Sequence, residues 1–405
     1  LPGPEMDSVL EARCVDLERG VGRLANLGSH DALVILRAAF GSPVILNILR
    51  SSPCFGNPLL ERFDGIVKSA LETIGNCKLS DSAWTQATLP IRHGGLGVRS
   101  VVMLAPSAFL ASAASTLLLQ TEILSESTSS GDQFVDKCVT YWSNRFNQTP
   151  ALEILAGSQR LWDSVAVEQV KAKLFADAKD SRDVARLLAA SAEHSGDWLK
   201  ALPITSCGLR LSDDEVRIAV CLRLGCDTCV PHRCKCGSEV DSTGRHGLTC
   251  RISAGRQPRH YWLNDIVHHA LTRAGVPAVK EPVGLADGLR PDGATLVFWA
   301  PGKPVAWDVT VADTLAETYL DRTVHVAGAA AEFLADAKTR KYAALVDKYI
   351  FIPLAFETLG PVCAEGVLFL KELGKRINSI TDDPKETSFL FQRLSVAINS
   401  KFPSL

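Results

Sequence analysis

Four cysteine and histidine residues in the second half of the chain have the types and spacing of a zinc site. They form the pattern Cys234-x-Cys236, followed by His246-x₃-Cys250. Thiolates and imidazoles suit Zn²⁺, and four of them close a tetrahedral site that leaves no open position for water or substrate. The pattern therefore predicts a structural zinc, which would hold together a loop too small to bury a core of its own.

The sequence leaves the choice of zinc ligands open. Cys226-x₂-Cys229 lies just upstream, and either of these cysteines, or His232, could replace one of the four. The alternative interpretation is a group of buried free cysteines, which are common in protein cores. Six of the twelve cysteines fall within thirty residues, and this density favours a metal site over a disulfide framework. It also indicates a reducing, intracellular compartment.

Two aspartates further along the chain could hold a second metal. Asp292 follows Arg290-Pro291, and Asp308 lies within the apolar run 305–311. Alternation along a strand would place Asp308 on the face opposite Trp307 and Val309. A carboxylate buried in such surroundings is costly unless it is paired or bound to a metal. The pair therefore predicts a Mg²⁺ site, although Asp292 alone could equally end a turn after proline.

The elements around these residues indicate an α+β fold. Residues 1 to about 200 are predicted to be helical; for example, Asn57-Pro58 opens a run at helical spacing that Gly75-Asn76 closes. Ser212 and Glu215 form a capping box before another helix. The glycine-rich segment Leu89–Gly97 predicts a tight turn or a close backbone approach. Beyond residue 257, helices are predicted at 261–274, 324–346, 361–377 and 386–399, and they alternate with strand-like segments at 278–283, 295–300, 305–311 and 349–356. We therefore divide the chain into 1–200 (helical), 201–256 (basic linker with the zinc cluster) and 257–405 (α/β).

Composition and charge bound the class of protein. A chain of 405 residues with 46% hydrophobic and 22% charged residues is typical of a soluble, multidomain protein. The net charge is −2, so a nucleic-acid partner would have to meet a local basic surface, and ten Lys and Arg against six acids between Lys200 and His260 provide one. The start of the chain has no features of a signal peptide. The nineteen-residue uncharged run from Val101 to Leu119 contains Pro106, and we expect it to be a buried helix, with no membrane partner.

The second half of the chain resembles the PD-(D/E)-x-K nuclease superfamily, and within it the restriction-like endonuclease of non-long-terminal-repeat retrotransposon polyproteins. In those proteins a Cys-Cys-His-Cys finger precedes the nuclease. The resemblance covers about residues 220 to 400, and the segment Leu89–Gly97 is similar to the thumb and linker that follow the reverse transcriptase. The matching nuclease segments are Glu281-Pro282, Arg290–Gly293, Trp307–Val311, Lys338-x-x-Lys341-Tyr342 and Glu357-Thr358.

The resemblance implies a restriction-endonuclease-like α/β domain in which Asp292 and Asp308 hold Mg²⁺. The motif expects a lysine two residues after the second acid, where this chain has Thr310. The retrotransposon branch draws its lysine from a downstream helix, which makes Lys338 or Lys341 the replacement. These two lysines are three residues apart and so share roughly one helical face, although either could be a solvated surface lysine. Glu281 is a further candidate ligand, or a plain strand-edge acid.

The resemblance also implies partners. The finger and a basic segment would grip DNA phosphates, and the nick would leave a 3′-hydroxyl that primes reverse transcription in the nucleus, with element RNA as a partner in a full-length protein. The basic segment consists of Arg251, Arg256 and Arg259. The chain lacks the Tyr/Phe-x-Asp-Asp turn of a reverse transcriptase, so we expect a fragment or truncated derivative that does not polymerise. The alternative is a catalytically inactive, zinc-containing nucleic-acid-binding protein derived from such an element.

Overall fold

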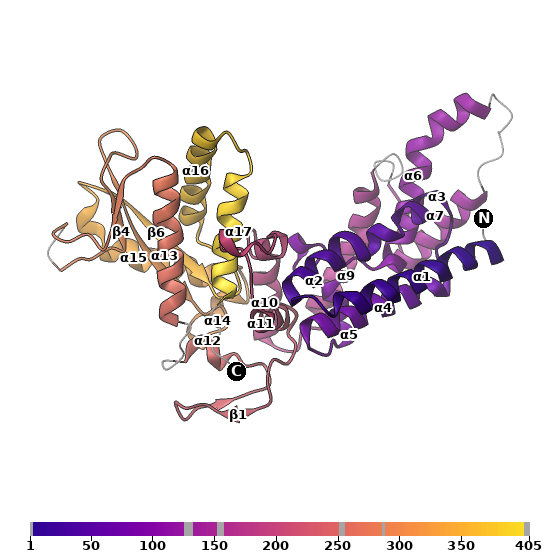
Figure 1. Cartoon of the computed structure of the whole chain (residues 1–405), viewed down its shortest axis with the longest axis horizontal. Coiled ribbons are helices and arrows are strands. Elements are labelled where there is room, and N and C mark those ends of the chain that lie inside the picture. Colours follow the sequence, from indigo (N-terminus) through magenta and orange to yellow (C-terminus); the bar gives the residue numbers. More distant parts are fainter. Residues whose placement is uncertain (1–2, 125–132, 152–157, 251–255, 286–287, 401–405) are drawn as a thin grey trace. The chain divides into compact units, whose positions relative to one another are not determined.

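The chain folds into two compact units of mixed α+β content. The computed structural model describes residues 3–124, 133–151, 158–250, 256–285 and 288–400. The first unit spans Leu1–Asp177 and the second spans Ala178–Leu405. Each unit is described by itself below, with elements labelled as in Figure 1.

The described residues of the first unit form helices joined by turns and loops, with no strand among them (Figure 1). The helices that pack most extensively against each other are α1 with α4, and α6 with α3, α7 and α9. In chain order the helices are α1 (Pro4–Leu24), α2 (Ser29–Ile35), α3 (Leu46–Ser51), α4 (Pro58–Gly75), α5 (Asp81–Ala87), α6 (Val101–Leu124), α7 (Gln133–Phe146) and α9 (Gln159–Ala176).

Local signals account for the ends of these helices. The side chain of Asn57 accepts a hydrogen bond from the Leu59 amide at the start of α4, and Asn76 ends the helix in the left-handed conformation, as the sequence predicted. In the turn Leu89–Gly97, a Cβ on Gly95 would lie 2.0 Å from the Leu89 carbonyl oxygen, which confirms the close backbone approach.

The uncharged run 101–119 begins as a core helix. Buried Asp64 accepts hydrogen bonds from the Val101 amide (2.8 Å) and the Ser100 hydroxyl (2.5 Å), and so caps α6. Much of the helix from Val101 to Ala111 is buried, as the sequence predicted. A different helical stretch, Ser29–Ser51, is long and apolar enough to cross a membrane by length and composition, a test that a core helix also passes. The stretch is divided into α2, a π-helical turn, a 3-10 turn and α3.

The second unit contains the strands and the candidate sites. Short helices lead into a two-stranded hairpin, which is followed by a four-stranded sheet with helices on both faces. Its elements are α10 (Ser181–Ser191), α11 (Asp213–Leu224), β1 (His232–Arg233), β2 (Glu239–Val240), α12 (His246–Thr249), α13 (Arg256–Arg273), β3 (Ala278–Lys280), β4 (Gly293–Thr295), β5 (Val305–Ala312), α14 (Glu317–Thr323), α15 (Ala329–Lys341), β6 (Ile350–Glu357), α16 (Ala364–Thr381) and α17 (Glu386–Asn399).

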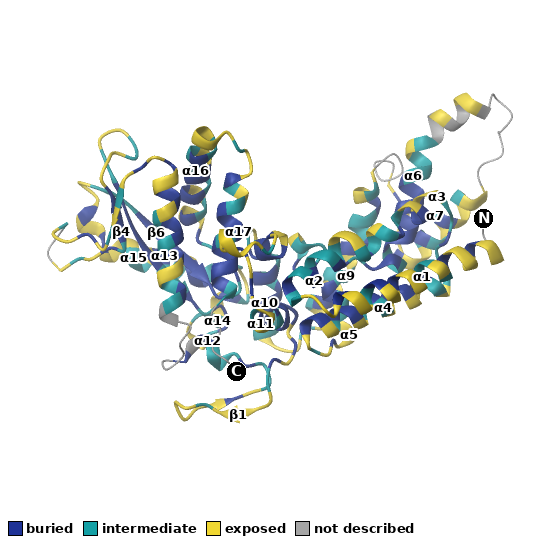
Figure 2. Ribbon diagram, in the orientation of Figure 1, coloured by how far each residue is buried: buried dark blue, intermediate teal, exposed yellow. Residues whose placement is uncertain are grey.

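The larger sheet has the strand order β3-β4-β5-β6. β3, β4 and β5 are antiparallel neighbours, whereas β5 and β6 are parallel and are joined through α14 and α15. Helices α13, α16 and α17 cover one face, where Trp307 and Val309 lie in a shared apolar core. Helix α15 covers the other face through alanines that pack on Ala355 of β6. Figure 2 shows β4 and β6 of this sheet as mostly buried ribbons, next to helices whose outer faces are exposed.

Three predicted elements in this unit differ from the structure. The strand predicted at 278–283 ends at Lys280, just before Glu281, whose φ of 48° is left-handed. The strand predicted at 295–300 ends at Thr295, because the Thr295 hydroxyl donates to the Val297 carbonyl and accepts from the Val305 amide as the chain turns. The side chains of Leu296 and Phe298 are therefore exposed. The long helix predicted at 324–346 is confined to α15, because Gly328 adopts a left-handed conformation just before it.

The second unit includes residues before 200 because Trp198 is buried in it. Its backbone amide donates to the Ser395 hydroxyl of α17 at 3.0 Å. At Ser212, both hydrogen bonds of the predicted capping box are present.

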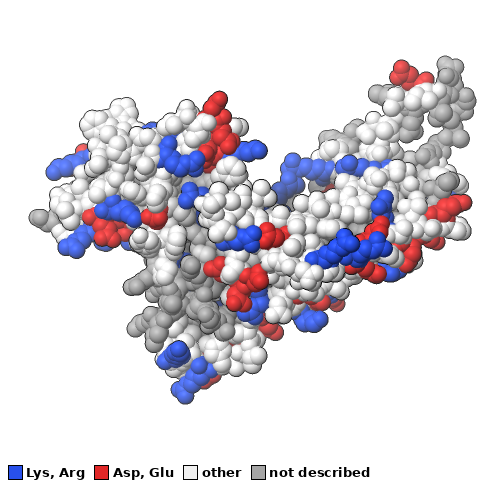
Figure 3. Space-filling model, viewed as in Figure 1, with Lys and Arg blue, Asp and Glu red and all other residues white. Residues whose placement is uncertain are grey.

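On the face drawn in Figure 3, Lys and Arg side chains lie among Asp and Glu, in keeping with the small net charge.

Candidate functional site

The four residues of the predicted zinc pattern converge in the structure. The ligand atoms of Cys234, Cys236, His246 and Cys250 all lie within 4.8 Å of one another. The Sγ atoms of Cys234 and Cys250 are 3.7 Å apart. A tetrahedral zinc with bonds of about 2.3 Å to sulfur sets two sulfurs about 3.8 Å apart. The cluster therefore has the ligand types and the spacing to hold a metal such as zinc.

A hairpin and a short helix bring these ligands together. Cys234 and Cys236 lie in the turn between β1 and β2, where the Gly237 amide donates to the Cys234 carbonyl and Gly237 has a φ of 91°. His246 begins the single turn of α12 and Cys250 follows it, and the Cys250 amide donates to the His246 carbonyl. The segment has few apolar residues to bury, so a metal would supply most of its cohesion.

The alternative ligands make other contacts. The Cys229 Sγ donates to the Asp241 carbonyl at 3.3 Å, and His232 Nδ1 lies 2.9 Å from the Val230 carbonyl. Hydrogen bonds from Ser238 lower the pKa of the Cys236 thiol to about 6, which favours the thiolate that binds metal. Among the described residues, the structure thus brings together the first set of four that the sequence suggested.

The two aspartates lie opposite each other on adjacent strands. Gly293 pairs with Trp307 in the antiparallel register of β4 and β5, so Asp292, one residue before β4, is placed across from Asp308. The side chain of Asp308 is 5% exposed and that of Asp292 is 18% exposed. Trp307 and Val309 face the core on the other side, which confirms the predicted alternation along β5.

Two donors hold one oxygen of Asp292. The Val309 amide donates to Oδ2 at 2.6 Å, and Nε2 of His260 lies 3.0 Å from the same atom. His260 Nε2 is also 2.9 Å from the Val309 carbonyl. Because both neighbours of Nε2 accept hydrogen bonds, Nε2 carries the proton. The hydrogen bond to Asp292 raises the pKa of His260.

Asp308 is held by residues from α15 and the turn that follows it. Lys338 Nζ lies 2.5 Å from Oδ1, and the Tyr342 hydroxyl donates to Oδ2 at 2.6 Å. Burial, the hydrogen bond to Asp308 and the charges of Asp308 and Asp292 all raise the pKa of Tyr342, so its hydroxyl stays protonated as a donor. Of the two candidate lysines, Lys338 contacts the carboxylate directly. Lys341 reaches only the Tyr342 hydroxyl, at 3.2 Å.

The remaining candidate ligand, Glu281, lies near the pair through its backbone. Its amide donates to the Asp292 carbonyl at 3.0 Å, and its φ of 48° is in the left-handed region. The Glu281 side chain itself is exposed. Thr310, where the motif expects lysine, lies beyond Asp308 on the same face of β5 and lines a pocket at the end of that strand.

Asn264, Trp307 and Gly293 position the loop that carries Asp292. Asn264 of α13 donates to the Asp292 carbonyl at 3.2 Å and accepts from the buried Trp307 indole at 2.8 Å. A Cβ on Gly293 would lie 2.0 Å from the Trp307 ring. The glycine after Asp292 therefore lets the loop lie flat against the indole.

Sequence reasoning missed His260 and Asn264. The predicted helix began at residue 261, so His260 was placed outside it, whereas α13 begins at Arg256 and puts both side chains on one face. The detectable signal was a polar pair four residues apart on an otherwise apolar helical face.

Of the three arginines in the basic segment, the structure describes the side chain of Arg259 only. Arg251 lies outside the described residues, and so does the side chain of Arg256. Arg259 is only 2% exposed and lines the pocket that Thr310 also lines. It can therefore reach only a ligand that enters this pocket.

Comparison with known proteins adds no family to these observations. No protein-family model matches the chain. No curated protein matches it either.

Proposed function

We propose that the chain is a Mg²⁺-dependent DNA endonuclease, the nuclease-bearing part of a non-long-terminal-repeat retrotransposon protein. It would nick target DNA and leave a 3′-hydroxyl for reverse transcription. The observation that carries the proposal is the convergence of Asp292, Asp308 and Lys338 from three separate elements. A four-stranded mixed sheet between helices fits the restriction-like domain that the resemblance implies.

The donor set fits Mg²⁺, which prefers carboxylate oxygens and is commonly held by one or two carboxylates. Asp292 and Asp308 would hold it, and the bound ion would polarise phosphoryl oxygens and lower the pKa of a water. His260 and the Val309 amide orient Asp292, and Tyr342 orients Asp308. Lys338, whose Nζ lies 2.5 Å from Asp308 Oδ1, would orient the attacking water or take up its proton.

Exposed aromatic residues beside the pair favour a nucleic acid as the substrate. Tyr261 and Trp262 directly follow His260 on α13 and are 59% and 46% exposed. Lys280 Nζ lies 5.1 Å from the centre of the Tyr261 ring. Aromatic faces next to cations are platforms on which nucleobases stack.

The test is nicking of supercoiled plasmid DNA with Mg²⁺. We expect the chain to convert supercoiled plasmid to open circles whose nicks a DNA polymerase can extend without phosphatase treatment. Asp292→Asn and Asp308→Asn should abolish nicking, and Lys338→Ala should slow it about 10²- to 10⁴-fold if this lysine acts as the general base. Asp336→Asn is the matched control, because Asp336 is an exposed acid on the same helix as Lys338.

Two results would decide against the nuclease. Nicking that Asp292→Asn and Asp308→Asn leave intact would come from a contaminant or another site. DNA binding without any nicking would favour the alternative, a catalytically inactive nucleic-acid-binding protein that keeps the zinc cluster. Zinc content and circular dichroism of each variant establish that the fold survives the substitution.

A further inference from the structure

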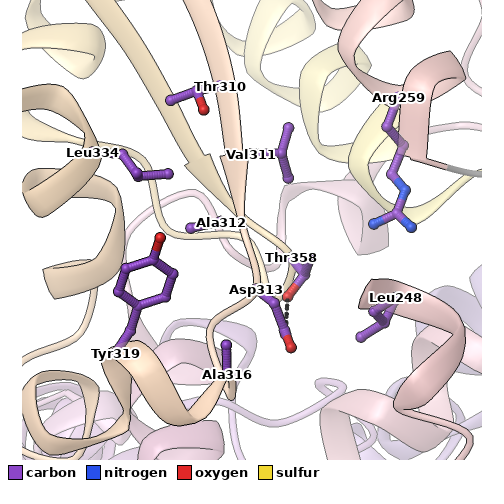
Figure 4. Close-up of a pocket in the computed structure, with 10 residues that line it drawn as sticks. All are labelled: Leu248, Arg259, Thr310, Val311, Ala312, Asp313, Ala316, Tyr319, Leu334 and Thr358. Carbon is purple, nitrogen blue, oxygen red and sulfur yellow. Dashed lines mark hydrogen bonds between the residues drawn. The ribbon is translucent and has the colours of Figure 1, made fainter. Parts of the chain in front are cut away.

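A pocket at the carboxyl ends of β5 and β6 has no role in the site described so far. It encloses about 280 Å³ and is lined by residues from both strand ends and from three helices. Leu248 also lines it, from the segment 234–250 that carries the predicted zinc ligands, called the zinc-bearing segment below. Figure 4 shows Arg259 on one side and Tyr319 on the other, with Ala312 and Asp313 between them. In α/β sheets, crevices outside the carboxyl ends of parallel strands are common ligand sites.

The pocket lies next to the aspartate pair, one side chain further along the same face of β5. Thr310 lies two residues beyond Asp308 on the same face of β5, about 7 Å along the strand. Leu334 lies four residues before Lys338 on the same face of α15, about 6 Å along the helix. Because α15 connects parallel strands and runs back against them, both steps lead in the same direction. A DNA strand that places one phosphodiester at Asp308 therefore has its neighbouring nucleotide at the pocket.

The lining combines one cation, positioned polar groups and apolar walls. Arg259 is buried and its guanidinium faces the pocket (Figure 4). The Asp313 carboxylate is fixed by hydrogen bonds from the Thr358 hydroxyl (3.0 Å) and the Leu315 amide (3.3 Å). Guanidinium groups bind phosphates and base edges, and a fixed carboxylate accepts from base amino groups.

The size of the pocket and the chemistry of its walls limit the ligand to about the size of one nucleotide. The volume is at the lower end of ligand pockets, too small for a stacked pair of bases. Leu334, Val311 and Leu248 supply apolar surface, and the hydroxyls of Thr310 and Tyr319 add hydrogen-bonding groups. Leu248 belongs to α12, between His246 and Cys250, so the zinc cluster also shapes one wall.

We propose that this pocket binds a single unstacked nucleotide of the DNA strand, next to the phosphodiester held at Asp292 and Asp308. The inference rests on the proposed endonuclease function for the identity of its substrate. It assigns the zinc-bearing segment a second task, because holding Leu248 in place completes the pocket. It also gives Arg259, Thr310 and Tyr319 a role in substrate placement.

The test measures binding and needs no cleavage. A short single-stranded oligonucleotide that contains 2-aminopurine is titrated with the full chain carrying Asp292→Asn, in Ca²⁺ buffer. We expect 2-aminopurine fluorescence to rise at one position, because the fluorescence of this base increases when it leaves the stack. Adding Ala316→Phe, which places a ring in the pocket, should remove the signal and weaken binding about 5- to 100-fold, the loss expected for one base contact.

A second variant and a control distinguish the loss of the pocket from misfolding of the protein. Tyr319→Phe removes only a hydroxyl and should weaken binding about three- to tenfold. Ala344→Phe places the same ring on an exposed residue outside the pocket and should leave binding unchanged. Unchanged binding in both Ala316→Phe and Tyr319→Phe overturns the proposal, and so does a free deoxynucleoside monophosphate that binds as tightly as the oligonucleotide.

The outcomes separate this inference from the proposed function. Nicking by the wild-type chain together with pocket-independent binding would leave the nuclease standing and remove the nucleotide site. Pocket-dependent binding together with a wild-type chain that never nicks would keep the nucleotide site and remove the nuclease.

Discussion

Replacing Gly293 with alanine should destabilise the second unit by about 2–6 kcal/mol. The new Cβ would lie 2.0 Å from one Trp307 ring atom and 2.4 Å from two others. Carbon atoms in contact need about 3.5 Å, so the ring would have to withdraw by about 1.5 Å. Trp307 is fully buried and its indole donates to Asn264, so the ring cannot withdraw without breaking that hydrogen bond. Overpacking costs about 1–3 kcal/mol, and buried groups that lose their partners cost about 1–3 kcal/mol more.

Amide hydrogen exchange is the appropriate assay, because it reports β4 and β5 separately from the first unit. Urea unfolding followed by circular dichroism gives the total change. Gly65→Ala is the control, since Gly65 lies within α4 with no atom near its would-be Cβ, and this change should stabilise by about 0.5–1 kcal/mol.

A double-mutant cycle isolates the contact itself. Trp307→Phe removes the part of the indole that the new methyl group would strike. The combination of Gly293→Ala with Trp307→Phe should therefore be less destabilising than the sum of the two changes, by at least about 1 kcal/mol. Strictly additive effects, or a Gly293→Ala protein as stable as the wild type, would refute the packing that we assign to this loop.

Two further predictions concern the zinc cluster and a buried acid. Purified protein should contain one zinc per chain by mass spectrometry, and Cys250→Ser should lose it while Cys229→Ser keeps it; the reverse pattern would show that the ligand set is wrong. Burial raises the pKa of Asp64 to about 6, from a model-compound value of 3.8, so the folded state holds this proton more tightly than the unfolded state. The contribution of Asp64 to the free energy of unfolding should thus fall by about 3 kcal/mol as the pH rises from about 4 to above 6. Urea unfolding of the wild type and Asp64→Asn across this range should diverge accordingly, and parallel curves would contradict the shift.

Local signals in the sequence were sufficient for many of the helices and for the strand that carries Asp308. The Asn57 cap, the capping box at Ser212 and the alternation around Trp307 depend on residues within a few positions of one another, so their physics can be read along the chain. The zinc pattern is also local, since its four ligands span only seventeen positions.

Tertiary structure alone decided which distant groups meet Asp292 and Asp308. Lys338 and Lys341 are equivalent in spacing, but the crossing of α15 over β5 brings only Lys338 to within 2.5 Å of Asp308. His260 reaches Asp292 because α13 begins earlier than its apolar pattern indicates. The pocket at Arg259 likewise forms from strand ends, helices and the segment that carries the Cys/His cluster, which no single stretch of sequence contains. Contacts of this kind depend on packing across the sheet, which periodicity along the chain does not encode.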